Sequence, residues 1–103
     1  MDFKDIFSVE GKVVCVTGGG GGIGRGIAGG FVAGGAHVYI ASRSDLSEIA
    51  RELDAGGPGK CTALRADLSK DEDIRGLVEQ LRAREAKLDV LINNAALGNF
   101  QHK

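Results

Sequence analysis

The chain has 103 residues, of which 17 are glycine, one is proline and none is tryptophan. Its 13 basic and 14 acidic side chains give a formal net charge of -1, which leaves no basic excess to neutralise a phosphate backbone and argues against nucleic-acid binding. The length indicates one small domain or part of a larger one, and a hydrophobic content of 43% is too high for a disordered chain.

The expected compartment is the cytoplasm. No apolar run approaches the roughly 20 residues that a membrane helix needs, and the first residues lack the apolar core of a signal peptide. Cys15 and Cys61 each lie in an apolar run, which favours buried free thiols over a disulfide framework. We therefore expect a soluble protein with no membrane partner.

The first predicted strand, Lys12–Thr17, is dominated by valine. Its apolar residues are consecutive, as in a parallel strand that is buried on both faces. A glycine cluster follows, since eleven of the glycines lie between Gly18 and Gly35. Apolar residues at helical spacing then predict a helix over Gly22–Ala33, which Gly34 and Gly35 end. A second strand is predicted over His37–Ala41.

The second half of the chain continues the alternation. Apolar residues recur at helical spacing between Leu46 and Leu53 and predict a second helix, which ends in the turn Ala55–Gly59. A third strand is predicted over Cys61–Ala66. Its end is followed by Ser69 and Glu72 at the spacing of a capping box, which predicts Ser69 as the N-cap of the third helix.

The third helix is predicted to reach about Ala86 and to carry one apolar stripe. The stripe consists of Ile74, Leu77, Val78 and Leu81. A fourth strand is predicted over Leu88–Asn93. Strands that alternate with helices of this length imply right-handed crossovers and an α/β, Rossmann-like, doubly wound parallel sheet. Residues 1–103 are expected to form one partial domain of this kind, with no second domain.

The glycine loop Thr17–Gly24 lies between a strand and a helix. Backbone N–H groups at a helix N-terminus are unpaired and lie at the positive end of the helix dipole, and glycine lets them approach a pyrophosphate. Both Gly19-x-Gly21-x-x-Gly24 and Gly18-x-x-x-Gly22-Ile23-Gly24 fit dinucleotide-binding spacings. A P-loop is excluded because no Gly-Lys-Ser/Thr follows. The alternative is a flexible turn without a ligand.

Four motifs, in order and at family spacing, make the chain resemble the short-chain dehydrogenase/reductase family. They are Thr17-Gly18-x-x-x-Gly22-Ile23-Gly24, Ser42-Arg43, Ala66-Asp67-Leu68 and Asn93-Asn94-Ala95. The segments Val9–Val16 and Ala55–Cys61 are also similar to NADPH reductases of the 3-oxoacyl and rhamnolipid-biosynthesis type. The resemblance implies a sheet with strand order 3-2-1-4, with a cofactor crevice between the first and fourth strands.

Ser42 and Arg43 decide the cofactor. An acidic residue at this place would bond the ribose 2′-hydroxyl of NAD, whereas a hydroxyl and a guanidinium suit a 2′-phosphate. The resemblance therefore implies NADP(H) in preference to NAD(H). Arg43 could instead be a solvated surface residue, and Asp45 is near enough in sequence to pair with it.

The remaining motifs imply further cofactor contacts. Asp67 and Leu68 correspond to family residues at the adenine, although an aspartate here could equally cap the next turn. Asn93, Asn94 and Ala95 would line the crevice, fix neighbouring backbone and reach a ribose hydroxyl. Ala96 stands where the family has glycine, and its Cβ is expected to crowd the ribose.

The family's acid/base chemistry uses a serine and a Tyr-x-x-x-Lys beyond the fourth strand. The one tyrosine of this chain, Tyr39, lies in the predicted second strand, so no catalytic residue and no metal ligand is assigned. We expect the cofactor-binding front portion of a longer reductase, truncated after the fourth strand. The alternatives are a non-catalytic nucleotide-binding module and a non-functional product. An uncovered sheet face and edge predict marginal stability or self-association.

Overall fold

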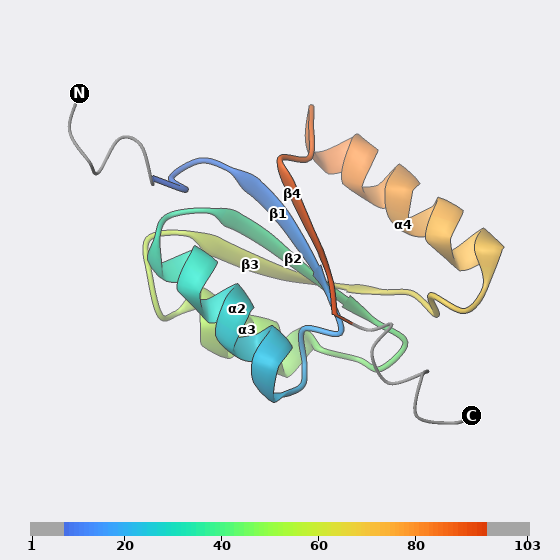
Figure 1. Ribbon diagram of the computed structural model, residues 1–103, viewed down its shortest axis with the longest axis horizontal. Helices are drawn as coiled ribbons and strands as arrows, with labels where there is room; N and C mark the ends of the chain where they lie inside the picture. Colours follow the sequence, from blue (N-terminus) through green and yellow to red (C-terminus); the bar gives the residue numbers. More distant parts are fainter. Residues whose placement is uncertain (1–7, 95–103) are drawn as a thin grey trace.

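Parallel strands and helices alternate along the chain in the computed structural model, which describes residues 8–94 (Figure 1). The elements are β1 (Val13–Thr17), α2 (Gly22–Ala33), β2 (His37–Ser42), α3 (Ser47–Asp54), β3 (Lys60–Arg65), α4 (Asp71–Arg84) and β4 (Val90–Asn93). Each predicted element is present, and α2 has the predicted bounds. The predictions placed β3 one residue too late and extended α4 too far.

The four strands form one parallel sheet in the order β3-β2-β1-β4, as predicted. Their register brings the carboxyl ends of the strands together. Thr17 at the end of β1 is aligned with Ala41 on one side and with Asn93 on the other. Ser42 at the end of β2 is aligned with Arg65 at the end of β3. The predicted site residues therefore meet at one edge of the sheet.

Helices cover the sheet unequally. Helices α2 and α3 pack on one face, where Ala28, Val32 and Ala50 contact a cluster that includes the fully buried Val16 and Ile40 (Figure 1). Helix α4 lies on the opposite face. There it contributes one buried residue, Leu77, to a second cluster that is otherwise built from the strands and the start of the loop after β3. Burying these side chains is the main stabilising contribution of both layers.

The face under α4 is incompletely covered, as predicted. Ile74 and Val78 of the predicted apolar stripe are 40% and 43% exposed, and Leu91 of β4 is 59% exposed. A hollow of about 240 Å³ lies beside α4 and is lined partly by Val78 and Leu88. Self-association through this face stays a prediction. Sedimentation velocity of the purified chain at several concentrations measures it directly.

The predicted capping box at the start of α4 is wrong. The N-cap residue is Lys70, and no side chain caps the helix. Asp67 forms a local turn instead, in which its Oδ1 accepts hydrogen bonds from the backbone N–H of Ser69 at 3.0 Å and from the Ser69 hydroxyl at 2.7 Å. The Asp67 carboxylate thus takes the Ser69 N–H that Glu72 would accept in a capping box, and the helix begins one residue later than the spacing predicts.

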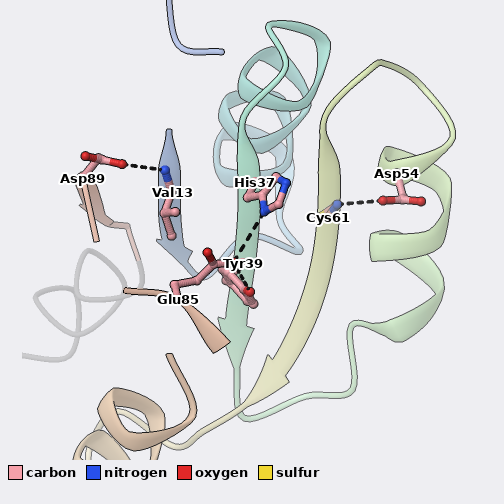
Figure 2. A network of polar contacts seen from close by, with 7 residues as sticks. All are labelled: Val13, His37, Tyr39, Asp54, Cys61, Glu85 and Asp89. Atoms are coloured by element: carbon pink, nitrogen blue, oxygen red, sulfur yellow. Dashed lines mark hydrogen bonds and ion pairs between the residues drawn. The ribbon is translucent and has the colours of Figure 1, made fainter. Parts of the chain in front are cut away.

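Carboxylates hold the amino-terminal ends of three strands (Figure 2). Asp89 Oδ2 accepts from the N–H of Val13 in β1 at 2.8 Å, and Asp54 Oδ1 accepts from the N–H of Cys61 in β3 at 2.9 Å. In β2 the Tyr39 hydroxyl donates to Glu85 Oε2 at 2.6 Å. Burial and this carboxylate raise the pKa of Tyr39 to about 12. These contacts fix the end of the sheet that lies opposite the predicted site.

The glycines within α2 and just after it differ in whether the structure requires them. Gly35, with φ +92°, ends the helix, since its N–H donates to Val32 O at 3.0 Å and the next N–H donates to Phe31 O at 3.0 Å. Gly26 and Gly30 lie inside the helix, and a Cβ at either position would meet no atom within 4 Å. Nothing in the structure therefore requires glycine at these two positions.

We expect Gly26→Ala and Gly30→Ala each to raise the free energy of unfolding by about 0.5–1 kcal/mol, because glycine inside a helix loses more conformational entropy on folding than alanine. Urea denaturation followed by circular dichroism measures the change. Gly35→Ala is the matched control and should destabilise the chain, because its backbone has a positive φ. A loss of stability in both helix variants would contradict the expectation.

Candidate functional site

The crevice between β1 and β4 is held by Thr17 and two asparagines. The Thr17 hydroxyl donates to Asn93 Oδ1 at 3.0 Å and accepts from the backbone N–H of Asn94 at 3.1 Å. The Asn94 side-chain amide donates to the carbonyl of Gly18 at 3.3 Å. These side chains thus tie the start of the glycine loop to the end of β4. Of the residues predicted here, Ala95 and Ala96 lie outside the described residues.

The first turn of the glycine loop requires glycine twice. Gly18 has φ +70°, and its N–H donates to the carbonyl of Ala41 at 2.8 Å, which binds the loop to β2. Gly24 lies directly against this turn. A Cβ on Gly24 would overlap the Gly18 carbonyl oxygen and would lie 2.9 Å from Asn94 Nδ2. Helix α2 can approach the crevice this closely only because residue 24 has no side chain.

Gly19 and Gly20 have packing roles that the sequence did not reveal. A Cβ on Gly19 would lie 2.7 Å from Ile40 Cβ, and one on Gly20 would lie 2.6 Å from Leu46 Cδ2. The loop is therefore pressed against β2 and against the segment that leads into α3. In a run of consecutive glycines no sequence signal separates these positions from their neighbours.

The N-terminus of α2 is open to a ligand. A Cβ at Gly21 or Gly22 would meet no atom within 4 Å. No side chain caps this end, and its first turn holds no acidic residue. The helix thus begins beside open space at the positive end of its dipole, which is an arrangement that binds a diphosphate. Ile23 beside them is 72% exposed.

Arg25 of α2 contacts the neighbouring helix. Its guanidinium forms an ion pair with Glu52 of α3. Exposed pairs of this kind contribute little to stability. Arg25 is therefore engaged with the neighbouring helix in the described structure.

Ser42 and Arg43 lie at the tip of β2. Ser42 Oγ accepts from the N–H of Ser44 at 3.0 Å. The Arg43 guanidinium forms no hydrogen bond or ion pair with any residue between 8 and 94. Asp45 binds Ser47 instead, through its N–H at 2.9 Å and its hydroxyl at 2.6 Å, and these bonds lower the pKa of the Asp45 carboxyl. The pairing of Arg43 with Asp45 that the sequence allowed is not formed.

Asp67 follows β3 at the same edge. Hydrogen bonds from Ser69 lower the pKa of its carboxyl, and Arg43 adds a smaller favourable charge. The alternative reading, an aspartate that organises the next turn, describes this carboxylate correctly. Leu68 packs its side chain against the cluster under α4, so only its backbone is free to face a ligand. Adenine contacts of these two residues stay predictions.

Three features meet at the carboxyl end of the sheet. The N-terminus of α2 is open, Gly24 lets α2 approach the turn at Gly18, and the Arg43 guanidinium at the tip of β2 has no partner among the described residues. Residues 12–103 match the family model described as short chain dehydrogenase. The chain belongs to the short-chain dehydrogenase family.

Relatives within this family include reductases of known structure. The chain is 42% identical over 91 residues to a rhamnolipid-biosynthesis 3-oxoacyl-[acyl-carrier-protein] reductase of Pseudomonas aeruginosa, across 86% of this chain and 35% of that protein. The Pseudomonas aeruginosa RhlG/NADP active-site complex matches with a TM-score of 0.81 and 42% identity, across 86% of this chain and 36% of that one. An NADH-dependent reductase complexed with NAD matches with a TM-score of 0.74 and 32% identity, across 82% of this chain and 36% of the reductase.

The chain thus spans about a third of the length of these relatives. Solved relatives with either NADP or NAD bound share its fold. Within residues 8–94, no helix is both long and apolar enough to cross a membrane.

Proposed function

We propose that this chain is the NADP(H)-binding part of a reductase. The observation that carries the proposal is the open N-terminus of α2, where a Cβ at Gly21 or Gly22 meets open space while one at Gly24 meets backbone. A diphosphate fits the open side, and the close approach at Gly24 brings it beside the crevice between β1 and β4. The proposed cofactor-binding residues are Thr17, Gly18, Gly22, Ile23, Gly24, Ser42, Arg43, Asp67, Leu68, Asn93, Asn94 and Ala95.

The preference for NADP(H) over NAD(H) rests on Arg43. Its guanidinium has no protein partner among the described residues and lies at the tip of β2, where the adenosine ribose lies in sheets of this topology. A guanidinium binds a phosphate dianion through paired charge-assisted hydrogen bonds. When bound, NADP(H) supplies hydride exchange with a carbonyl or an alcohol. A 3-oxoacyl group is the proposed substrate of the whole protein, by similarity to the Pseudomonas reductase.

Binding without catalysis is the second candidate for these 103 residues alone. The hydroxyl of Tyr39, the one tyrosine in the sequence, donates a hydrogen bond to Glu85 and has a pKa raised to about 12. A general acid/base at neutral pH needs a pKa near 7 and a position beside the substrate. Tyr39 meets neither condition, which favours a nucleotide-binding module. The buried free thiols of Cys15 and Cys61 fit a reducing compartment, and we propose the cytoplasm.

Titration of the purified chain with NADPH tests the proposed function. Enclosure of the dinucleotide in the crevice should enhance and blue-shift its fluorescence, with saturation. The absence of a saturable signal up to millimolar NADPH and NADH would rule out both the reductase portion and the binding module. A serine and a Tyr-x-x-x-Lys encoded beyond Lys103 would favour the reductase portion over the binding module, because neither candidate predicts carbonyl turnover by these 103 residues alone.

Arg43→Asp should reverse the cofactor preference. The substitution removes the partner of the 2′-phosphate and adds a carboxylate that repels it but can accept from the 2′-hydroxyl of NADH. We expect the ratio of the NADPH and NADH dissociation constants to change by about 30-fold, the equivalent of roughly 2 kcal/mol. Arg75→Asp on α4 is the charge-matched control. An unchanged ratio would refute the assignment of Arg43.

A further inference from the structure

Arg65, which the sequence motifs did not include, holds the loop that carries Arg43. Its Nε donates a hydrogen bond to the carbonyl oxygen of Arg43 at 2.9 Å. The two residues come from the ends of neighbouring strands, since Arg65 is the last residue of β3 and Arg43 follows the last residue of β2. This contact joins β3 to the loop that is proposed to recognise the cofactor's 2′-phosphate.

The side chain of Arg65 lies on the face where the glycine loop leads into α2. Ile40 belongs to the cluster under α2 and α3, and Ala63 packs against that cluster. Alternate residues of a strand share a face, so Ser42 and Arg65 extend from this face at the carboxyl end of the sheet. Their register pairs them side by side. Arg65 therefore lies on the same side of the sheet as the N-terminus of α2.

Arg65 keeps most of its donors available. Only Nε has a hydrogen-bond partner among residues 8–94, which leaves both terminal nitrogens of the guanidinium free. Asp45 carries an opposing charge that interacts with Arg65. Its carboxylate is held by Ser47 and interacts with Arg65 only through longer-range attraction. Two guanidinium groups without a close carboxylate partner thus flank the tips of β2 and β3.

We propose that Arg65 is a second specificity residue for NADP(H), which positions Arg43 through its carbonyl and adds a positive charge for the 2′-phosphate. The inference rests on the proposed cofactor function. It assigns to Arg65 a phosphate-dependent role, because NADPH and NADH differ only at the 2′ position. A residue that merely stabilised the sheet would affect both cofactors equally.

The test compares dissociation constants for NADPH and NADH in the 103-residue chain and its variants. Arg65→Gln should weaken NADPH by about fivefold and change NADH by less than about twofold, since one charge-assisted contact is lost. Arg65→Lys keeps the charge and should recover most of the NADPH affinity. Asp45→Asn removes the negative charge beside Arg65 and should strengthen NADPH binding without strengthening NADH binding. Arg51→Gln, an exposed position on α3, is the control.

The outcomes separate a failure of the role of Arg65 from a failure of the proposed cofactor function. Equal weakening of NADPH and NADH in Arg65→Gln, or no weakening of either, overturns the role of Arg65 while the wild-type affinities leave the proposed function standing. A wild-type chain that binds neither cofactor overturns both proposals. Should Arg65→Gln fail to fold by circular dichroism, Arg65→Lys and Asp45→Asn carry the test. An NADPH affinity that Asp45→Asn leaves unchanged, together with a large loss in Arg65→Lys, would then refute the charge contribution.

Discussion

Gly24→Ala is expected to abolish cofactor binding and to destabilise the fold. The added Cβ would overlap the Gly18 carbonyl oxygen and approach Asn94 Nδ2 to 2.9 Å. The carbonyl is backbone of the turn and the Asn94 amide is hydrogen-bonded to it, so α2 must move away from β1 and take its N-terminus with it. We expect the NADPH dissociation constant to rise by more than about 100-fold and the free energy of unfolding to fall by about 1–3 kcal/mol, as for overpacked sites.

Gly22→Ala separates binding from stability at the same loop. Its Cβ would meet open space in the protein, so the free energy of unfolding should not fall. The same Cβ would occupy the side of the helix N-terminus where the diphosphate is proposed to lie, so NADPH should still bind more weakly. Fluorescence titration and urea denaturation of both variants measure the two quantities. Wild-type NADPH affinity in Gly24→Ala would show that the diphosphate does not lie here.

The sheet could be predicted from the sequence because each strand is a short apolar run and each helix carries apolar residues at helical spacing. Consecutive valines in β1 indicate a strand that is buried on both faces, and Val13–Val16 are buried. The turn after β3 could not be predicted in the same way. Ser69 and Glu72 fit a capping box, but Asp67 accepts from the Ser69 N–H, which the box would have paired with Glu72. Local hydrogen-bond competition is not visible in a spacing pattern.

The candidate site was also predicted from the sequence only in part. Gly18, Gly24, Thr17 and Asn94 were predicted from motif spacing, and the structure brings them together. Gly20 was not predicted to pack, because its role depends on Leu46, which is distant along the chain and was assigned to a helix face. Arg65 was missed because the predicted third strand continued to Ala66. With β3 ending at Arg65, the guanidinium stands at the strand tip rather than inside the sheet.

Buried thiols provide a measure of the fold that does not depend on the cofactor. Cys15 is fully buried under α4 and Cys61 is 8% exposed on the opposite face. Burial raises the pKa of each thiol from 9.0 to about 11, with Asp54 adding to the effect at Cys61. Because only the thiolate reacts, we expect iodoacetamide at pH 8 to label both at least about 100-fold more slowly than free cysteine.

The raised thiol pKa values also predict how the free energy of unfolding depends on pH. A raised thiol pKa means that the folded state favours the neutral form, so the stability that these groups contribute is complete below about pH 9 and is lost as the pH rises toward 11. The unfolding free energy should therefore fall over this range. Cys15→Ala and Cys61→Ala, measured in parallel, should each reduce the fall. A profile that is flat from pH 8 to 10.5 would contradict the burial of the thiols.

Labelling also distinguishes a stable domain from one that opens readily, which matters because α4 leaves part of its face exposed. If both thiols react through global unfolding, Cys15 and Cys61 label at one common rate, and NADPH at 100 times its dissociation constant slows both by about 100-fold through mass action. If α4 detaches first, Cys15 beneath it labels faster than Cys61, and NADPH protects Cys61 more strongly. Labelling of both at the rate of free cysteine would show that the sheet does not persist in solution. The comparison of the two rates therefore locates the weakest layer of the fold, and its dependence on NADPH links that layer to the crevice between β1 and β4.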